Sequence, residues 1–360
     1  MKKPLLWLVV VVLGVSMIAA FSLTGCKAAP AEETAAVTTA EETTAETTAE
    51  TTAETTAETT KEVTMLFVPG IADPFYFTME KGIQAKADEL NINLIVSEYP
   101  ESWGPEAQVP ILEAAAAVGG IDLILTAPTS TDALIAPLKK LYDQGITIIT
   151  VDTYLGDGDY SVESDYSFPL SYIGTDNKLG GQEVARHLAE MLDETGNVYV
   201  MNTNPDTSSV VDRGEGFTEG IAEFPNMTLI GMDYCLDVQQ EAQNLTTAAL
   251  QKDPDIVGIF GVNLFSAQGA YQAVVNAGLT GAVKIASWDA TQDLINALKE
   301  GKVDLVLAQK PAEIGALGVE WGYKYLKNGE EVPKKVIPGF EFFTADNVDD
   351  PDMQQFIYSK

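Results

Sequence analysis

Short apolar runs alternate with longer amphipathic runs along most of the chain, beginning near residue 63. The apolar runs are rich in Ile, Leu and Val and do not alternate with polar residues, which is typical of parallel strands covered on both faces. The first half contains four predicted strands, at 63–68, 93–97, 123–126 and 147–151, and three predicted helices, near 74–90, 105–117 and 132–143. This order of elements predicts an α/β fold.

A second series of the same kind begins at residue 172. Its predicted strands are 172–174, 197–201, 228–232, 257–260, 283–287 and 304–308, and its predicted helices lie near 178–193, 212–223, 239–252, 265–276, 292–298 and 311–326. Two similar α/β units in tandem predict two lobes with a cleft between them. Because ligands of open parallel sheets bind beyond the carboxyl ends of the strands, we expect a binding site in that cleft.

The N-terminal segment carries a different pattern. An apolar run over 5–20 follows two lysines and closes on the sequence Leu-x-Gly-Cys, which ends at Cys26. This order of charge, apolar core and small residues predicts a secretory signal peptide over 1–25. The segment resembles the lipobox of bacterial lipoproteins, which implies that Cys26 is lipidated and anchors the chain to the cell membrane. A transmembrane helix is the alternative, since the run is just long enough to span a bilayer, but the placement of the cysteine favours the lipoprotein.

The next segment, 26–62, consists mainly of Ala, Thr and Glu, with Ala-Glu-Thr-Thr repeated in tandem over 45–60. So few large apolar side chains cannot offset the entropy that ordering costs. We therefore predict a disordered tether between the lipidated Cys26 and a globular part that begins at residue 63. An isolated helix is disfavoured, because the many threonines lower its stability in water.

The net charge and the scarcity of cysteine and histidine limit the partners and reactions that are possible for the globular part. The net charge is −32 at pH 7, which argues against a nucleic-acid partner, since phosphate binding needs clustered Lys and Arg. Of the two cysteines, Cys26 is assigned to the lipid, so Cys235 has no partner for an intramolecular disulfide. His187 is the only histidine, which argues against His-rich zinc sites and Ser–His or Cys–His catalysis. We expect no metal and no cofactor.

Polar or aromatic residues repeatedly follow the ends of the predicted strands. They are Asp73, Phe75, Tyr76, Asp152, Thr153, Arg213, Asn263, Trp288, Asp289 and Gln309. A helix N-cap would explain any one acidic or amide residue there, but the set combines acceptors, donors and flat rings. Carboxylates accept hydrogen bonds from sugar hydroxyls, and arginine and amides donate to them. No nucleophile in the set has an adjacent base, so we predict binding without turnover and no catalytic residue.

Several short motifs occur together in a fixed order. They are Asp73-Pro74-Phe75-Tyr76, Ile149-Thr150-Val151-Asp152, the segment 172–181, Asp212-Arg213, Asn263, Ser287-Trp288-Asp289 and Ala308-Gln309-Lys310-Pro311. With these motifs the chain resembles the ribose-type branch of periplasmic sugar-binding proteins of ABC importers, over essentially all of 63–343. The resemblance implies the periplasmic binding protein type I fold, with two Rossmann-like lobes, a three-stranded hinge and a central ligand cleft. The expected N-terminal lobe is 63–171 plus 310–338, and the expected C-terminal lobe is 172–309 plus 339–360.

The resemblance also implies roles for the matching residues. Phe75 and Tyr76 would sandwich a sugar ring. The sugar hydroxyls would form hydrogen bonds with five residues, namely Asp152, Arg213, Asn263, Asp289 and Gln309.

Three positions depart from the ribose pattern. Asp73 stands where Asn is usual, Thr153 replaces an Arg, and the aromatic residue expected near the helix at 239–252 has no clear counterpart, with Tyr234 and Asp237 the nearest candidates. Ribose is therefore not identified as the ligand.

Two tryptophans are further candidates for the binding site. Trp288 could supply the missing flat surface, with core packing as the alternative. Trp103 could reach the rim of the cleft, although an ordinary loop position is favoured.

These observations predict a monomeric, lipid-anchored extracytoplasmic protein that closes on a monosaccharide-like ligand and delivers it to an ABC permease. Two alternatives keep the fold: a ligand-sensing subunit for a chemoreceptor or sensor kinase, and a binder of a furanose-like signal molecule. An extracellular glycoside hydrolase is a third alternative, with Asp152 and Asp289 as its carboxyl pair. A gene regulator with this fold would carry a DNA-reading helix pair where this chain has a signal peptide and tether.

Overall fold

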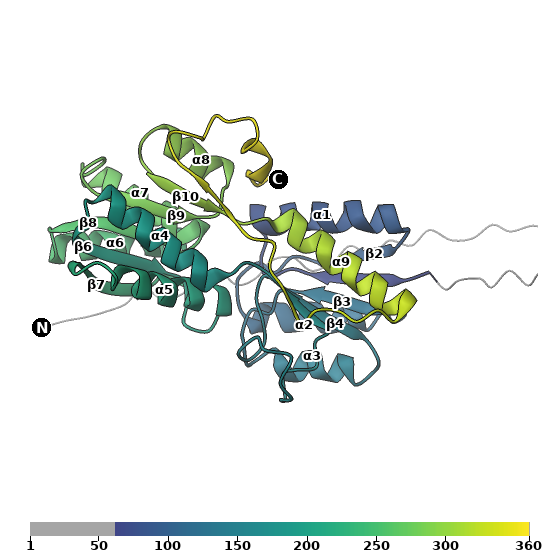
Figure 1. The fold of residues 1–360 in the computed structure, drawn as a ribbon. Coiled ribbons are helices and arrows are strands. Elements are labelled where there is room, and N and C mark those ends of the chain that lie inside the picture. Colours follow the sequence, from purple (N-terminus) through teal and green to yellow (C-terminus); the bar gives the residue numbers. More distant parts are fainter. Residues whose placement is uncertain (1–61, 360) are drawn as a thin grey trace, which may run out of the picture. The chain divides into compact units, whose positions relative to one another are not determined.

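A computed structural model describes residues 62–359, which lie within one compact unit of the chain (Figure 1). The predicted signal peptide, the lipidated Cys26 and nearly all of the predicted tether lie outside the described residues. Within the described part of the chain, no helix has the length and apolar character needed to cross a membrane.

The strands form two six-stranded sheets. The first has the order β11-β5-β4-β3-β1-β2, with the bounds Lys335–Val336, Ser171–Ile173, Thr147–Val151, Leu123–Thr126, Thr64–Val68 and Asn93–Val96. The second has the order β12-β10-β9-β8-β6-β7, with the bounds Glu341–Phe343, Leu305–Ala308, Lys284–Trp288, Ile256–Gly261, Thr195–Asn202 and Asn226–Tyr234. Every neighbouring pair is parallel except β10 and β12, so the predicted α/β fold class is confirmed.

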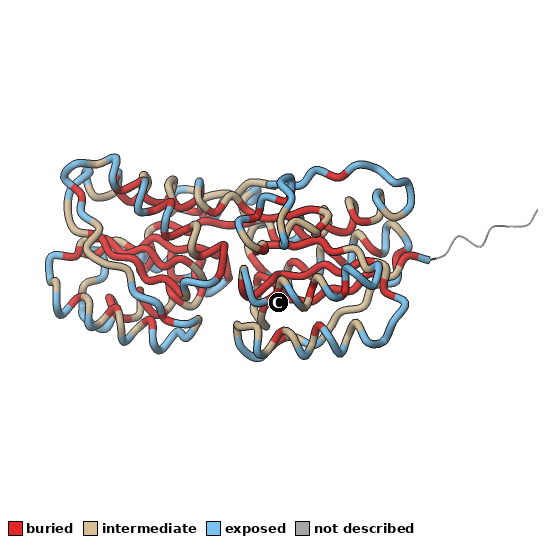
Figure 2. The backbone as a smooth tube through the Cα atoms, turned by 90° about the horizontal axis from the view of Figure 1, so that it is seen from below, coloured by how far each residue is buried: buried red, intermediate tan, exposed pale blue. Residues whose placement is uncertain are grey.

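Helices cover both faces of each sheet, which explains why the strands are apolar throughout (Figures 1 and 2). The first sheet lies between the pair α1 and α9 and the pair α2 and α3, with the bounds Pro74–Leu90, Pro311–Asn328, Pro105–Ala116 and Ile135–Tyr142. The second sheet lies between α4 and α5 on one face and α6, α7 and α8 on the other, with the bounds Asn177–Met191, Ser208–Ile221, Gln239–Lys252, Leu264–Asn276 and Gln292–Lys299. A short 3₁₀ turn, Gln354–Phe356, follows β12.

Three segments connect the two sheets, as expected for the hinge. They are 174–176 between β5 and α4, 309–310 between β10 and α9, and 337–340 between β11 and β12. The strand predicted to open the second series belongs instead to the first sheet, because β5 pairs with β4 and β11. The expected lobe boundary at residue 172 therefore lies two residues too early.

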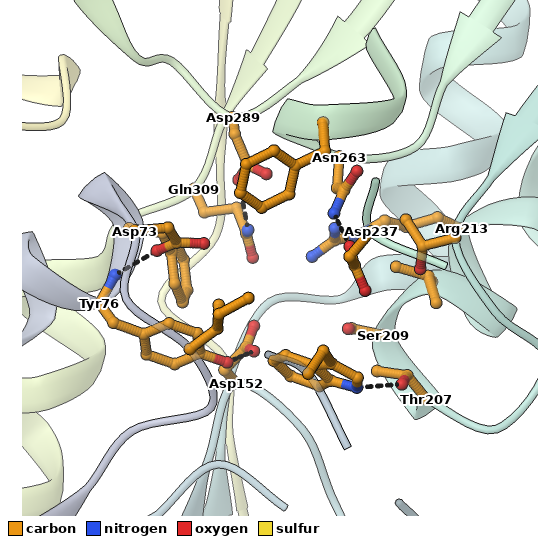
Figure 3. Close-up of a pocket in the computed structure, with 16 residues that line it drawn as sticks. Asp73, Tyr76, Asp152, Thr207, Ser209, Arg213, Asp237, Asn263, Asp289 and Gln309 are labelled. Atoms are coloured by element: carbon orange, nitrogen blue, oxygen red, sulfur yellow. Dashed lines mark hydrogen bonds between the residues drawn. The ribbon is translucent and has the colours of Figure 1, made fainter. Parts of the chain in front are cut away.

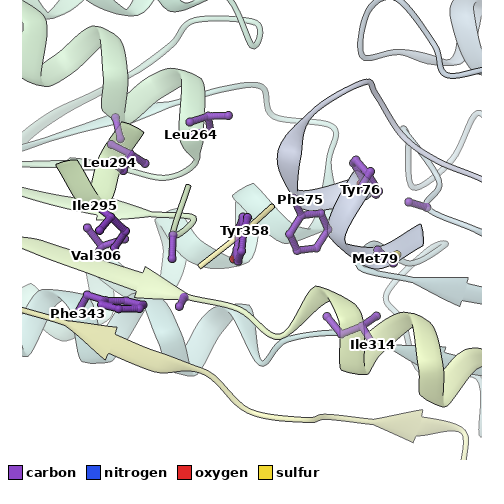
Figure 4. Close-up of a cluster of buried hydrophobic side chains, with 14 of the residues drawn as sticks. Phe75, Tyr76, Met79, Leu264, Leu294, Ile295, Val306, Ile314, Phe343 and Tyr358 are labelled. Carbon is purple, nitrogen blue, oxygen red and sulfur yellow. The ribbon is translucent and has the colours of Figure 1, made fainter. Parts of the chain in front are cut away.

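The C-terminal segment joins the two lobes beside the hinge. Tyr358 packs against Phe75, with 5.8 Å between the ring centroids, and Figure 4 shows the pair within one hydrophobic cluster that includes side chains of both lobes. The backbone N–H of Ser359 donates to the Thr78 hydroxyl of α1 (2.9 Å). The last residues therefore help to set the relative position of the lobes.

Glycines allow α4 and α5 to pack closely and so place Arg213. A Cβ atom at Gly216 would lie 2.0 Å from the Lys178 carbonyl oxygen, and one at Gly181 would lie 2.3 Å from the Arg213 carbonyl oxygen. Both obstacles are backbone atoms, which cannot move away as the end of a side chain can.

We predict that Gly216→Ala lowers the free energy of unfolding by about 2 kcal/mol through overpacking. Urea denaturation measures the change. Gly231→Ala is the matched control, because a Cβ there would meet only ring atoms of Tyr199 at 3.7 Å. Equal denaturation midpoints for the two variants would show that the α4–α5 contact tolerates a methyl group.

Candidate ligand-binding site

A cavity lies between the lobes, at the carboxyl ends of the strands of both sheets (Figure 3). The space between its lining side chains is about 430 Å³, including the part open to solvent. The first lobe contributes Ile71, Asp73, Phe75, Tyr76, Trp103 and Asp152. The second contributes Thr203, Thr207, Ser209, Val210, Arg213, Asp237, Asn263, Phe265 and Asp289, and the crossing segment contributes Gln309.

Two aspartates occupy equivalent positions in the two lobes. Asp152 directly follows β4 and Asp289 directly follows β9, and both have a left-handed backbone, with φ of 63° and 75°. Residues other than glycine rarely adopt this conformation, and it occurs often at functional sites. Both side chains are nearly buried, with 5% and 6% of their surface exposed. The sharp turn after each strand therefore directs a carboxyl group into the cavity.

Hydrogen bonds hold both carboxyl groups in place. The Tyr76 hydroxyl donates to Oδ2 of Asp152 (2.7 Å). Asp289 accepts from Gln309 Nε2 (3.0 Å) and the Tyr358 hydroxyl (3.3 Å) on Oδ1, and from the backbone N–H of Leu264 (3.1 Å) on Oδ2. Asp289 thus connects the second lobe with the hinge and the C-terminal segment.

Arg213 is held rigidly at the second-lobe wall. Its Nε donates to Asn177 Oδ1 (2.9 Å), its Nη1 donates to the Val262 carbonyl (3.0 Å), and the guanidinium lies 4.3 Å from the centre of the Trp288 ring. Among the described residues, Nη2 has no hydrogen-bond partner. The side chain is only 3% exposed, so a ligand in the cavity is a natural partner for Nη2.

Two lining residues also cap helices. Asp73 accepts from the backbone N–H of Tyr76 at the start of α1 (3.0 Å), and Asn263 accepts from that of Ser266 at the start of α7 (3.0 Å). Asn263 also donates through Nδ2 to Asp237 (2.6 Å). Capping a helix does not exclude these two residues from the ligand site, because each side chain has a second polar atom beside the one that caps the helix.

Burial changes the acidity of three cavity carboxyl groups. Desolvation raises the pKa of Asp73 well above its usual range, and repulsion from Asp289, Asp152 and Asp237 adds to the rise against the lowering effect of the Tyr76 backbone N–H. Desolvation raises the pKa of Asp152 to about 6, opposed chiefly by Arg213. Desolvation likewise raises the pKa of Asp237 to about 6, opposed by Asn263 and Arg213.

These shifts predict a pH dependence of stability in the absence of ligand. Between the unfolded pKa near 4 and the folded pKa near 6, the folded protein binds more protons than the unfolded chain, so Asp152 destabilises it increasingly as the pH rises. Lowering the pH from 7 to 5 should therefore recover about 1 kcal/mol from this group. We expect Asp152→Asn to show a correspondingly smaller gain in urea denaturation. A gain equal to that of the unsubstituted protein would contradict the assignment.

The lobes also contact each other directly around the cavity. Trp103 Nε1 donates to the Thr207 hydroxyl of the second lobe (2.8 Å), and the Tyr154 hydroxyl donates to Asp212 Oδ2 (2.9 Å). Ser208 Oγ accepts from the backbone N–H of Tyr154 (3.1 Å). These bonds hold the first-lobe loops against the start of α5, which carries Arg213.

A family model described as a periplasmic binding protein domain matches residues 64–331 of the chain. The chain belongs to this family. The ribose import binding protein of Salmonella typhimurium is 31% identical over 271 residues, which cover 75% of this chain and 86% of that protein. Members of the family bind solutes and do not transform them, so the chain is a binding protein and not an enzyme.

Solved structures of the family agree with the fold. A solute-binding protein from Agrobacterium vitis bound with α-D-tagatopyranose superposes with a TM-score of 0.81 at 39% identity, over 83% of this chain and all of that chain. A second solute-binding protein from the same organism, with bound D-fucose, superposes with a TM-score of 0.75 at 26% identity, over 82% of this chain and all of that chain. The two-lobed architecture of periplasmic binding proteins is thus shown for this chain.

The cavity of this family member brings together eight of the ten residues singled out in the sequence. They are Asp73, Phe75, Tyr76, Asp152, Arg213, Asn263, Asp289 and Gln309. Phe75 and Tyr76 meet edge to face at 5.0 Å, and the Tyr76 hydroxyl is engaged by Asp152.

Two expected site residues do not line the cavity. Trp288 is completely buried in the core against α4 and α5, where its ring supports Arg213 from behind. It therefore cannot supply the missing flat surface. Thr153 is also completely buried, and its hydroxyl donates to the Pro128 carbonyl (2.8 Å) rather than to the cavity.

Several residues that line the cavity were not predicted from the sequence, or were named there without being assigned to the site. Trp103, for which a loop position was favoured, lines the cavity, and so does Asp237. Phe265 provides an aromatic ring in the second lobe. It belongs to α7 and lines a neighbouring groove with Gln239 and Gln240 at the start of α6. Its position two residues after the Asn263 cap was the available signal. Ile71, Thr203, Thr207, Ser209 and Val210 come from loops or a helix start and carry no distinctive sequence pattern.

Proposed function

We propose that this protein is a lipid-anchored, extracytoplasmic solute-binding subunit that captures a small sugar or polyol by lobe closure and delivers it to an ABC permease. The observation that carries the proposal is the convergence of both lobes on one cavity, in which Asp152 and Phe75 face Arg213 and Asp289. The relatives support the class of ligand, since one is named for ribose import and one is bound with a tagatose ring.

The polar and aromatic residues of the cavity would contact different parts of the ligand. Asp152, Asp289 and Asp73 would accept hydrogen bonds from hydroxyl groups, and Arg213, Asn263 and Gln309 would donate to them. Phe75 and Phe265 would cover the C–H surfaces of the ring. Closure would then bring the groups of both lobes onto opposite sides of one ligand.

Thermal-shift screening of the purified protein against pentoses, hexoses, polyols and nucleosides tests the proposal. A ligand that binds only the folded state raises the melting temperature by mass action. We expect at least one sugar or polyol to do so, followed by saturable binding in calorimetry. A response restricted to nucleosides, or to none of these compounds, would contradict a sugar ligand.

The transport role needs a separate test in cells. A strain without this protein should lose uptake of the radiolabelled ligand, and a copy with an intact cavity should restore it. Normal uptake together with a lost behavioural or transcriptional response would favour the sensing alternative instead.

Lipid anchoring through Cys26 would keep the binding protein near its permease. We expect the unsubstituted protein to incorporate labelled fatty acid and to partition into detergent, and Cys26→Ser to do neither. A wild-type protein that is secreted without label would exclude the anchor. Size-exclusion chromatography with light scattering is expected to give a monomer.

A further inference from the structure

The cavity contains more carboxyl groups than one cation can balance. Asp73, Asp152, Asp237 and Asp289 line it, and Arg213 is the only cationic side chain among its described lining residues. Figure 3 shows the four carboxyl groups around one space, on different sides of it. A ligand with hydroxyl groups alone could accept and donate hydrogen bonds here, but it would bring no charge to balance the excess.

Arg213 compensates only part of this negative charge. Its field acts on Asp152 and Asp237, where it opposes the rise of their pKa, but it is not among the main influences on Asp73. Asp289 is surrounded by neutral donors, which are an amide, a phenol and a backbone N–H. Among the described residues, no cationic side chain therefore forms a hydrogen bond or an ion pair with Asp73 or Asp289.

Free carboxylate oxygens remain available to a ligand. Oδ2 of Asp73 and Oδ1 of Asp152 have no hydrogen-bond partner among the described residues, and both side chains line the cavity. Asp152 is only 5% exposed, so little water can reach its free oxygen. Burial favours the neutral form of Asp73 in the empty cavity. A cation brought by the ligand would favour the ionised form and pair with it.

A protein-bound metal ion is not a suitable source of that cation. Within the described residues, no three His, Cys, Asp or Glu side chains are grouped so that they could hold one ion. The four carboxyl groups instead surround a space of about 430 Å³ together with Phe75 and Phe265. Such spacing suits a positive charge carried on an organic framework.

We propose that the ligand is a polyhydroxy compound that carries a protonated amine, such as an amino sugar or amino polyol, and that Asp73 is the principal counter-ion of the amine. This inference rests on the proposed function and specifies its ligand class. The amine would donate to Oδ2 of Asp73, within reach of the negative field of Asp289. The hydroxyl groups of the ligand would accept hydrogen bonds from Arg213 Nη2 and from the side-chain amides on the opposite wall of the cavity.

Calorimetry with matched pairs of compounds at pH 7 tests the proposal. Each pair differs by one hydroxyl group replaced by an amine, as in glucose and glucosamine, galactose and galactosamine, or sorbitol and 1-amino-1-deoxysorbitol. The N-acetylated amines serve as neutral probes of similar size. We expect at least one amine to bind about tenfold or more tightly than its hydroxyl partner, since hydrogen bonds to charged groups exceed neutral ones by about this factor.

Asp73→Asn isolates the charge of the counter-ion. Asparagine caps helices as well as aspartate does, so α1 should remain folded while the preference for the amine disappears. Asp293→Asn is the control, because Asp293 is an exposed carboxylate in the first turn of α8 and lies outside the cavity lining. This variant should keep the full preference.

The outcomes separate this inference from the proposed function. If neutral sugars bind as tightly as their amines in every pair, the amine proposal fails while the sugar-binding function stands. An amine preference that survives Asp73→Asn would overturn the role of Asp73. If neither member of any pair binds while another sugar or polyol responds in the thermal-shift screen, the amine proposal fails and the proposed function stands. If that screen also gives no response, both fail.

Discussion

Replacing Asp289 by alanine is expected to weaken binding of the best ligand from the screen by about a hundredfold or more. Asp289 would bind the ligand directly, and it also accepts from Gln309, Tyr358 and the first N–H of α7. Without the carboxylate, these three buried donors lose their acceptor, and Gln309 loses the contact that orients its amide. The variant should therefore lose both a ligand contact and the arrangement of its neighbours.

The same substitution should also lower the free energy of unfolding by about 2 kcal/mol, because buried donors left unpaired are costly. Calorimetry measures the binding and urea denaturation measures the stability. Asp293→Ala is the control, since Asp293 is an exposed carboxylate in the first turn of α8. Unchanged affinity in a folded Asp289→Ala protein would remove this residue from the site.

Replacing Arg213 by alanine is expected to reduce affinity by a similar factor, about a hundredfold. The loss has two causes: Nη2 would no longer donate to a hydroxyl group, and Asp152 and Asp237 would lose the cation that favours their ionised forms. The ring of Trp288 would also lose the group that covers it. Since these losses concern hydroxyl recognition and the shape of the wall, they are expected for a neutral or a cationic ligand.

Arg186→Ala is the matched control for Arg213→Ala. Arg186 lies on the surface of α4, where it pairs with Glu183 and Glu223, and exposed ion pairs contribute little to stability. Calorimetry of the two variants beside the unsubstituted protein should show a loss only for Arg213→Ala. Equal affinities for both variants would mean that Arg213 has a purely structural role.

Much of the cavity could be located from the sequence because strands and their ends leave a strong pattern. Asp152 and Asp289 follow apolar runs directly, and the carboxyl ends of parallel strands gather at one edge. The same reasoning located Gln309 after β10. To predict that these residues lie at the cavity, it was enough to assign each strand and its direction correctly.

The errors arose where neighbours in sequence point in different directions. Trp288 and Asp289 are adjacent, yet successive side chains of a strand face opposite sides of the sheet, so Trp288 enters the core while the left-handed turn directs Asp289 to the cavity. Thr153 likewise adjoins a left-handed turn, the one at Asp152, and is completely buried instead of lining the cavity. Proximity in sequence was a poor guide to these side chains.

The order of strands and helices, the α/β class and the strand-end carboxylates of this protein follow from its sequence alone, because hydrophobic periodicity and local turns are short-range properties. Only the tertiary structure decided that Trp103, Asp237 and Phe265 reach the cavity, since they are brought there by loops and helix starts from both lobes. It also placed four carboxyl groups and one guanidinium around the same cavity. That charge balance depends on distances between segments far apart in the chain, which no local pattern encodes.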